Sequence, residues 1–71
     1  MILRFSIYGR FKVDVRHEDD TWVAYRADLG KQFRIDDLAI PPDLPPGELA
    51  NYLDAFYHEY AVPGQRVELL P

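Results

Sequence analysis

Residues 41–64 read PPDLPPGELANYLDAFYHEYAVPG and decide the fold, because prolines enclose a single amphipathic segment there. The prolines at the start cannot enter a sheet ladder or a helix interior, so residues 41–46 predict a stiff extended connector. Pro46 suits the first turn of a helix, and the Pro-Gly pair at 63–64 suits its end. The pattern therefore predicts one helix over about 46–61.

The two sides of this helix differ in chemistry. At about 100° per residue, one side carries an apolar stripe that we expect to pack on a sheet. The stripe consists of Leu49, Leu53, Phe56 and Tyr60, flanked by Tyr52 and Tyr57. The opposite side carries Asn51, Asp54 and His58. Tyr57 is expected to be the most exposed of the tyrosines, with its hydroxyl at the rim of the core.

Alternating apolar and polar residues predict strands in the remaining chain. The strands are expected at about 2–8, 11–16, 21–26 and 32–35, with a final strand over 66–70. Residues 38–40 are expected to extend the fourth strand after a bulge, and Phe33 and Ile35 to point inward. The predicted fold class is α+β: one domain over residues 1–71, with an antiparallel sheet of three to five strands, one helix on one face, and the order βββ(β)αβ.

The turns set the register of the sheet. A two-residue loop at Gly9 would place the apolar rows of the first two strands on opposite faces, so we expect an odd loop with Gly9 at a positive φ. The polar residues 17–20 predict a four-residue turn, which would place Val15 opposite Trp22. Trp22 is therefore expected in the core.

Composition limits the class of protein. A domain of 71 residues has a thin stability margin, so self-association would be an easy gain, and a homodimer is one expectation. The chain has no cysteine, which excludes disulfides and thiolate zinc sites and suits a reducing, cytoplasmic setting. No apolar run is long enough for a signal peptide or a membrane span, and no cofactor is expected.

Charge is unevenly distributed along the chain. Residues 1–34 carry seven bases and five acids, a net +2, whereas residues 35–71 carry one base and seven acids, a net −6. The acidic half could meet a basic partner or mimic a phosphate backbone electrostatically. It also argues against general nucleic-acid binding, which depends on clustered bases.

The face of the sheet away from the helix is a candidate partner-binding surface. It is expected to carry Lys12, Arg16, Val23, Tyr25 and Arg34. Tyrosine and arginine are enriched at protein interfaces, and Tyr57 at the helix edge is a further candidate contact. An alternative is that the basic sheet face stacks single-stranded nucleic acid, although such modules use two or three aromatic rings and one ring is expected here.

Asp54 and His58 form the remaining candidate site, because side chains four residues apart on a helix are neighbours. The pair could contact a partner or, with a third ligand, hold a metal ion. A solvated helix face is the simpler interpretation, and no metal site is predicted. No serine or threonine stands beside a base, so no catalytic residues are predicted.

Five segments together resemble a family of short bacterial proteins classed as a domain of unknown function, with the pattern FxxYGR, W, IPPDL and YLDxxYHE. They are Phe5-Ser6-Ile7-Tyr8-Gly9-Arg10, Trp22, Ile40-Pro41-Pro42-Asp43-Leu44, Tyr52-Leu53-Asp54 and Tyr57-His58-Glu59. The resemblance implies a bacterial domain and no activity. A looser similarity, in element order alone, is to small antitoxin domains. We therefore expect a non-enzymatic protein that binds an unknown protein partner, as an antitoxin-like, inhibitory or regulatory subunit.

Overall fold

The computed structural model describes residues 2–28 and 30–71 and has the predicted α+β fold, with a five-stranded antiparallel sheet and one α-helix packed against it. The strands are β1 (Ile2–Ile7), β2 (Phe11–Glu18), β3 (Thr21–Asp28), β4 (Lys31–Arg34) and β5 (Val67–Leu69). The helices are the 3₁₀ turn η1 (Pro46–Glu48), α1 (Leu49–Phe56) and the 3₁₀ turn η2 (His58–Tyr60).

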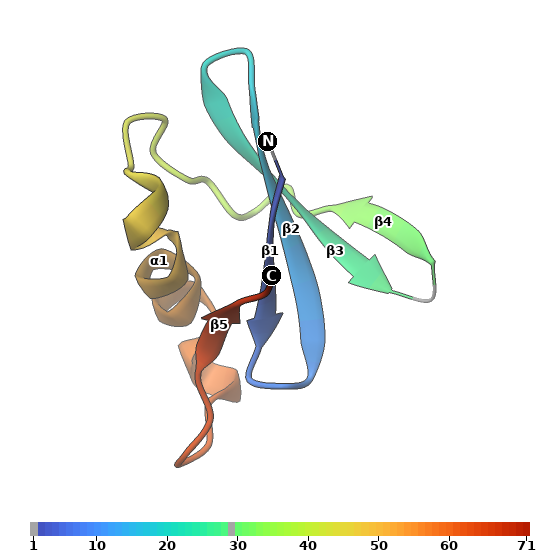
Figure 1. Cartoon of the computed structure of the whole chain (residues 1–71), viewed down its shortest axis with the longest axis vertical. Helices are drawn as coiled ribbons and strands as arrows, with labels where there is room; N and C mark the ends of the chain where they lie inside the picture. Colours follow the sequence, from blue (N-terminus) through green and yellow to red (C-terminus); the bar gives the residue numbers. More distant parts are fainter. Residues whose placement is uncertain (1, 29) are drawn as a thin grey trace.

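The sheet order is β4-β3-β2-β1-β5, and every pairing is antiparallel. Figure 1 shows α1 on one side of the twisted sheet, while β4 and the adjoining end of β3 extend away from it. We call the face toward α1 the inner face and the other the outer face. The helix covers only part of the inner face, and this arrangement creates the candidate site described below.

The loop between β1 and β2 confirms the predicted odd loop. Ile7 pairs with Phe11, so Tyr8, Gly9 and Arg10 form a three-residue turn closed by the Arg10 N–H to the Ile7 carbonyl (2.9 Å). Gly9 has φ +70° there, a conformation that glycine adopts without steric cost. The apolar rows of both strands therefore share the inner face.

The turn between β2 and β3 differs from the prediction. It has two residues, Asp19 and Asp20, both with positive φ (49° and 61°), as the primed turns of tight hairpins require. Aspartate tolerates this left-handed region better than most residues, so an Asp-Asp pair replaces the four-residue loop. Consequently Val15 pairs with Ala24, and the expected pairing of Val15 with Trp22 is wrong.

Trp22 still lies in the core, because the register error is two residues and a shift of two keeps each side chain on its face. It pairs with His17, and the two rings meet edge to face with centroids 4.7 Å apart. The Trp22 indole N–H donates to the Leu44 carbonyl at 3.0 Å. This bond fixes the proline-rich connector against the end of the sheet.

The helix is shorter than the predicted 46–61. Regular α-helix ends at Phe56, and the chain tightens into η2 after Tyr57, which has φ −99° and ψ 17°. Leu49 and Leu53 are fully buried as expected. Tyr57 continues the buried row of Leu49 and Leu53 at a spacing of four and is 8% exposed, whereas Phe56 and Tyr60 are 39% and 54% exposed. The expectation of an exposed Tyr57 beside a buried Phe56 and Tyr60 was wrong.

Two further expectations about the connector and β4 were wrong. Residues 38–40 form no strand, and instead Leu38 and Ile40 insert into the core as single apolar anchors. Phe33 pairs with Arg26 on the inner face, as predicted, but is 56% exposed because α1 stops short of β4. The core is thus concentrated under α1, around β1, β2 and the start of β3.

Candidate functional site

The outer face carries an ionic network centred on Asp14, whose side chain is completely buried. Arg4 on β1 donates to both carboxylate oxygens, from Nε at 2.6 Å and from Nη2 at 3.0 Å. Gln32 reaches the same carboxylate from β4, with Nε2 donating to Oδ2 at 2.7 Å. The Arg4 hydrogen bond lowers the pKa of Asp14 although burial opposes it. Asp14 therefore ties β1, β2 and β4 together as an anion.

Arg16 extends this network. Its Nη2 donates to the Gln32 Oε1 at 2.7 Å, and its guanidinium carbon lies 4.7 Å from the centre of the Tyr25 ring. Glu18 lies 3.7 Å from Nη1. The Arg16 Nε is buried and has no hydrogen-bond partner among the described residues. Arg16 and Tyr25 are thus engaged within the chain.

Most of the polar side chains of the predicted partner surface on the outer face therefore already have hydrogen-bond or ion-pair partners within the chain. Val23 shares this face but is buried, so the expectation of an open Val23 was wrong. Arg34 lies 3.5 Å from Asp36 at the sheet edge, and Lys12 is exposed. Most of the bases counted toward a phosphate-binding surface already contact acids or amides of the chain, which weakens the nucleic-acid interpretation.

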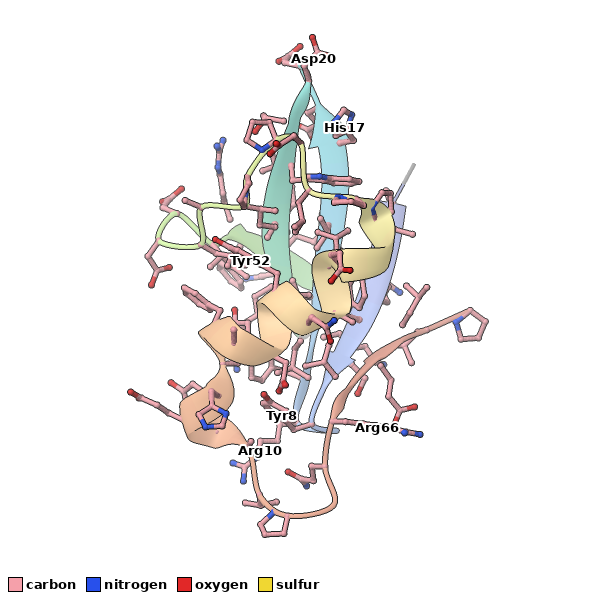
Figure 2. The ribbon with its side chains drawn as sticks, turned by 90° about the vertical axis from the view of Figure 1, so that its left-hand side faces the viewer. Tyr8, Arg10, His17, Asp20, Tyr52 and Arg66 are labelled. Atoms are coloured by element: carbon pink, nitrogen blue, oxygen red, sulfur yellow. The ribbon has the colours of Figure 1, made fainter. Side chains whose placement is uncertain are left out.

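Asp54 has a structural partner that the sequence did not reveal. The buried Tyr8 hydroxyl donates to the Asp54 carboxylate and, at 3.1 Å, to the Asp54 carbonyl. Burial first, and then this bond, raises the pKa of Tyr8 to about 12. Tyr8 has φ 54°, a strained conformation for a bulky residue, which the bond helps to hold. Figure 2 shows Tyr8 between the end of the helical segment and the chain that leads into β5.

His58 does not join Asp54 in a ligand cluster. It begins η2 and is exposed, and among the side chains of residues 2–27 and 30–71 no three His, Cys, Asp or Glu gather as a metal site would require. His17 lies at the opposite end of the sheet from Tyr8, near the Asp19-Asp20 turn (Figure 2). The geometry at Asp54 thus serves to fasten the helix to the first hairpin.

A hollow lies where α1 fails to cover β4. It has a volume of about 690 Å³ and is lined by four aromatic rings: Phe33 of β4, Phe56 of α1, Tyr57, and Tyr60 of η2. We call it the aromatic hollow. A smaller recess of about 240 Å³, bordered by Arg10 and Phe11, adjoins it through Arg26, Tyr57 and Tyr60. Three of the four rings of the hollow are substantially exposed.

Tyr57 is the rigid floor of the aromatic hollow. Its ring meets Phe11 and Phe56 edge to face, with centroids 5.2 Å and 4.8 Å apart. Arg26 lies over the Phe11 ring, its guanidinium carbon 4.1 Å from the centroid. Burial is the main cause of the raised pKa of Tyr57, with the nearby Asp37 charge acting in the same direction. The floor is packed, whereas Phe33, Phe56 and Tyr60 stand around it in solvent.

Charged groups ring the aromatic hollow. Asp36, Asp37 and Glu59 line it together with Arg26 and Arg34. Arg34 is paired with Asp36, and Arg26 is stacked on Phe11. Asp37 and Glu59 form no ion pair with the described part of the chain. The site therefore offers exposed aromatic surface beside two free carboxylates.

Of the predicted site residues, Arg34 and Tyr57 line the aromatic hollow, and the others lie elsewhere. The aromatic hollow itself was missed, because helical periodicity assigned Phe56 and Tyr60 to the core. No proline or glycine lies between Leu49 and Ala61, so no helix-breaking residue in the sequence marks the end of the regular helix at Phe56.

The fold and the site define a small α+β domain with an open aromatic surface. The chain belongs to the family described as "Domain of unknown function (DUF7661)", whose model matches residues 2–70. No curated protein and no solved structure matches the chain. Among the described helices, none has the length and apolar character needed to cross a membrane.

Proposed function

We propose that this domain is a non-enzymatic interaction module that binds a protein partner through the aromatic hollow. The observation that carries the proposal is the exposure of Phe33, Phe56 and Tyr60 around one hollow, on a chain of only 71 residues. Aromatic residues clustered in this way mark binding surfaces, because each ring can bury a large area at little cost in conformational entropy.

The contrast with the rest of the surface supports this choice. Apart from the Arg16 Nε, the polar groups of the Arg4, Asp14, Gln32 and Arg16 network have partners within the chain, and Asp54 holds Tyr8. Phe56 and Tyr60 contact the Tyr57 ring, and yet 39% and 54% of their surface stays exposed. A partner that covered them would gain apolar contact without displacing a structural bond, and the packed Tyr57 below them would provide a preorganised floor.

The proposal retains the setting expected from the sequence, a bacterial cytoplasmic protein that acts by occupying its partner as an antitoxin-like, inhibitory or regulatory subunit. A second copy of the chain would be one such partner, since small domains gain stability by covering further apolar area.

Site-specific photocrosslinking in the source cells tests the proposal. A benzophenone-bearing phenylalanine analogue replaces Phe33 or Tyr60, and in control variants it replaces Ile2 or Leu69. These controls are matched because both are 56% exposed, as Phe33 is, and neither lines the aromatic hollow. We expect a discrete crosslinked protein from positions 33 and 60 that is absent from positions 2 and 69.

Competition establishes that such a crosslink is specific. Excess unlabelled wild-type protein should remove the crosslinked product, whereas a folded Phe33→Ser, Tyr60→Ser double variant should not. A product of twice the chain mass would identify a second copy as the partner. Equal labelling from all four positions, or none from positions 33 and 60, would refute the proposal.

A further inference from the structure

The aromatic hollow combines two features that together select a ligand chemistry. Its walls are the rings of Phe33, Phe56 and Tyr60, and its rim includes Asp37 and Glu59. The carboxylates come from separate elements, Asp37 from the connector after β4 and Glu59 from η2. An aromatic surface alone would accept any apolar side chain, but carboxylates beside it disfavour acidic groups and favour cations.

The cations already in the hollow do not neutralise these two carboxylates. Arg34 pairs with Asp36 at 3.5 Å, and Arg26 lies over Phe11 at 4.1 Å. Arg10 borders only the smaller adjoining recess. Asp37 and Glu59 form no ion pair in the described chain, and with three acids against the bases Arg26 and Arg34 the lining keeps one net negative charge.

A guanidinium or ammonium group on an aliphatic stem matches both features. The stem can lie against aromatic rings while the charged head reaches the rim, and the negative face of each ring attracts the cation. Arg26 over Phe11 and Arg16 over Tyr25 show the same pairing within this chain. The net −6 charge of residues 35–71 would also speed the approach of a basic partner.

From this geometry we infer that the partner seats an arginine or lysine side chain in the aromatic hollow, contacting Phe33, Phe56 and Tyr60 with its stem and Asp37 and Glu59 with its charge. The inference rests on the proposed function and specifies the chemistry of the partner segment. A partner that offered only apolar side chains would leave both carboxylates facing an interface without a counter-charge, which is costly.

Two peptides that differ in charge alone test the inference. One is acetyl-Gly-Arg-Gly-Arg-Gly-amide, and in the other citrulline replaces each arginine, which keeps the shape and removes the positive charge. Titration of isotope-labelled protein, followed by amide NMR shifts, should place the arginine peptide at residues 33, 37, 56, 59 and 60. We expect binding at least about tenfold weaker for the citrulline peptide, and weakening with added salt.

Matched variants identify the carboxylates on which binding of the arginine peptide depends. Asp37→Asn with Glu59→Gln removes the two free carboxylates and should weaken binding of the arginine peptide at least about tenfold. Asp43→Asn with Glu48→Gln makes the same two kinds of change at carboxylates outside the aromatic hollow, and should leave most of the binding. Both pairs are exposed, so unchanged melting temperatures should confirm folding.

Equal responses to the two peptides, including no response to either, would overturn the inference. So would equal losses from the two pairs of variants. The proposed function fails separately: if the photocrosslink at Phe33 persists in Asp37→Asn, Glu59→Gln, the aromatic hollow binds a protein but not through a basic side chain. If the crosslink itself is absent, the proposed function fails whatever the peptides do.

Discussion

The packed region of this domain and the aromatic hollow both contain apolar and charged side chains, but these side chains are buried in the first and mostly exposed in the second. Under α1, Leu49 and Leu53 have no exposed surface, and on the outer face Asp14 has none either. In the aromatic hollow, Phe33 and Tyr60 are more than half exposed. The buried carboxylate of Asp14 is paired with Arg4, whereas the exposed carboxylates of Asp37 and Glu59 form no ion pair in the described chain.

The difference separates the residues that hold the fold from those free to bind. A buried side chain contributes its transfer free energy and its contacts to folding, whereas an exposed ring contributes little until a partner covers it. Substitutions in the packed region should therefore cost stability, and substitutions in the aromatic hollow should cost binding. The following predictions test that separation.

Leu53→Ala should have the largest effect on stability. Leu53 is fully buried beneath α1, so truncation leaves a cavity and should lower the free energy of unfolding by about 2–5 kcal/mol. A domain this small has only about 3–5 kcal/mol in total, so much of the variant should be unfolded at room temperature. Urea unfolding followed by circular dichroism measures the change.

Phe56→Ala is the matched control, since it creates the same residue on the same helix. Phe56 is 39% exposed and should lose clearly less stability than Leu53. Equal losses would mean that the end of α1 is as tightly packed as its middle, and would break the comparison.

Asp14→Asn should rank second. The amide keeps the shape but cannot accept both hydrogen bonds from Arg4, so we expect a loss of about 1–3 kcal/mol. Because its native pKa is lowered, Asp14 stabilises the fold above its unfolded pKa of about 3.9, and this contribution disappears as the pH falls through the native value. The difference in the free energy of unfolding between wild type and Asp14→Asn should therefore become smaller at acid pH.

Urea unfolding at about pH 7 and about pH 3 would measure this narrowing. Asp36→Asn is the control, because its ion pair with Arg34 is exposed and should change stability by less than about 0.5 kcal/mol at either pH. A constant gap between wild type and Asp14→Asn would show that the carboxylate charge does not stabilise the sheet.

Tyr8→Phe should cost about 1 kcal/mol, because it removes the bond to Asp54 while that exposed carboxylate can regain water. Because the pKa of Tyr8 is raised, the neutral phenol stabilises the fold fully at pH values below its unfolded pKa of about 10. This contribution is lost as the pH rises from about 10 to the native pKa of about 12. Ultraviolet titration of tyrosinate should show a late step that loses the Tyr8 contribution in Tyr8→Phe, leaving that of Tyr57, and that persists in full in Tyr60→Phe.

The sequence predicted the fold class well because its signals were local. Period-two runs define the strands, prolines define the limits of the helical segment, and parity at Gly9 fixes the first hairpin. The prediction for the second hairpin was wrong because aspartate rarely occupies two successive positions with positive φ. Asp19 and Asp20 do so in this turn. That error left the faces correct, since alternation is preserved by a shift of two.

The site was predicted less well because exposure depends on where elements end relative to one another. Helical periodicity placed Phe56 and Tyr60 in one stripe with Leu53, but it contains no information on whether the sheet extends beneath them. Similarly, the strand pattern predicts that Asp14 is a polar residue on the outer face. Its burial arises from Arg4 and Gln32, which lie 10 and 18 residues away in the sequence. Long-range contacts of this kind are invisible to local patterns.

Phe33→Ser combined with Tyr60→Ser should have the smallest effect on stability and the largest on function. Both rings are more than half exposed, so the free energy of unfolding should stay within about 0.5 kcal/mol per site of wild type. Urea unfolding measures this, and the competition experiment with the crosslinked partner measures the loss of binding. A large loss of stability would assign the rings to the core and remove the reason to regard the aromatic hollow as a binding surface. Retained stability with retained partner binding would instead place the functional surface elsewhere on the domain.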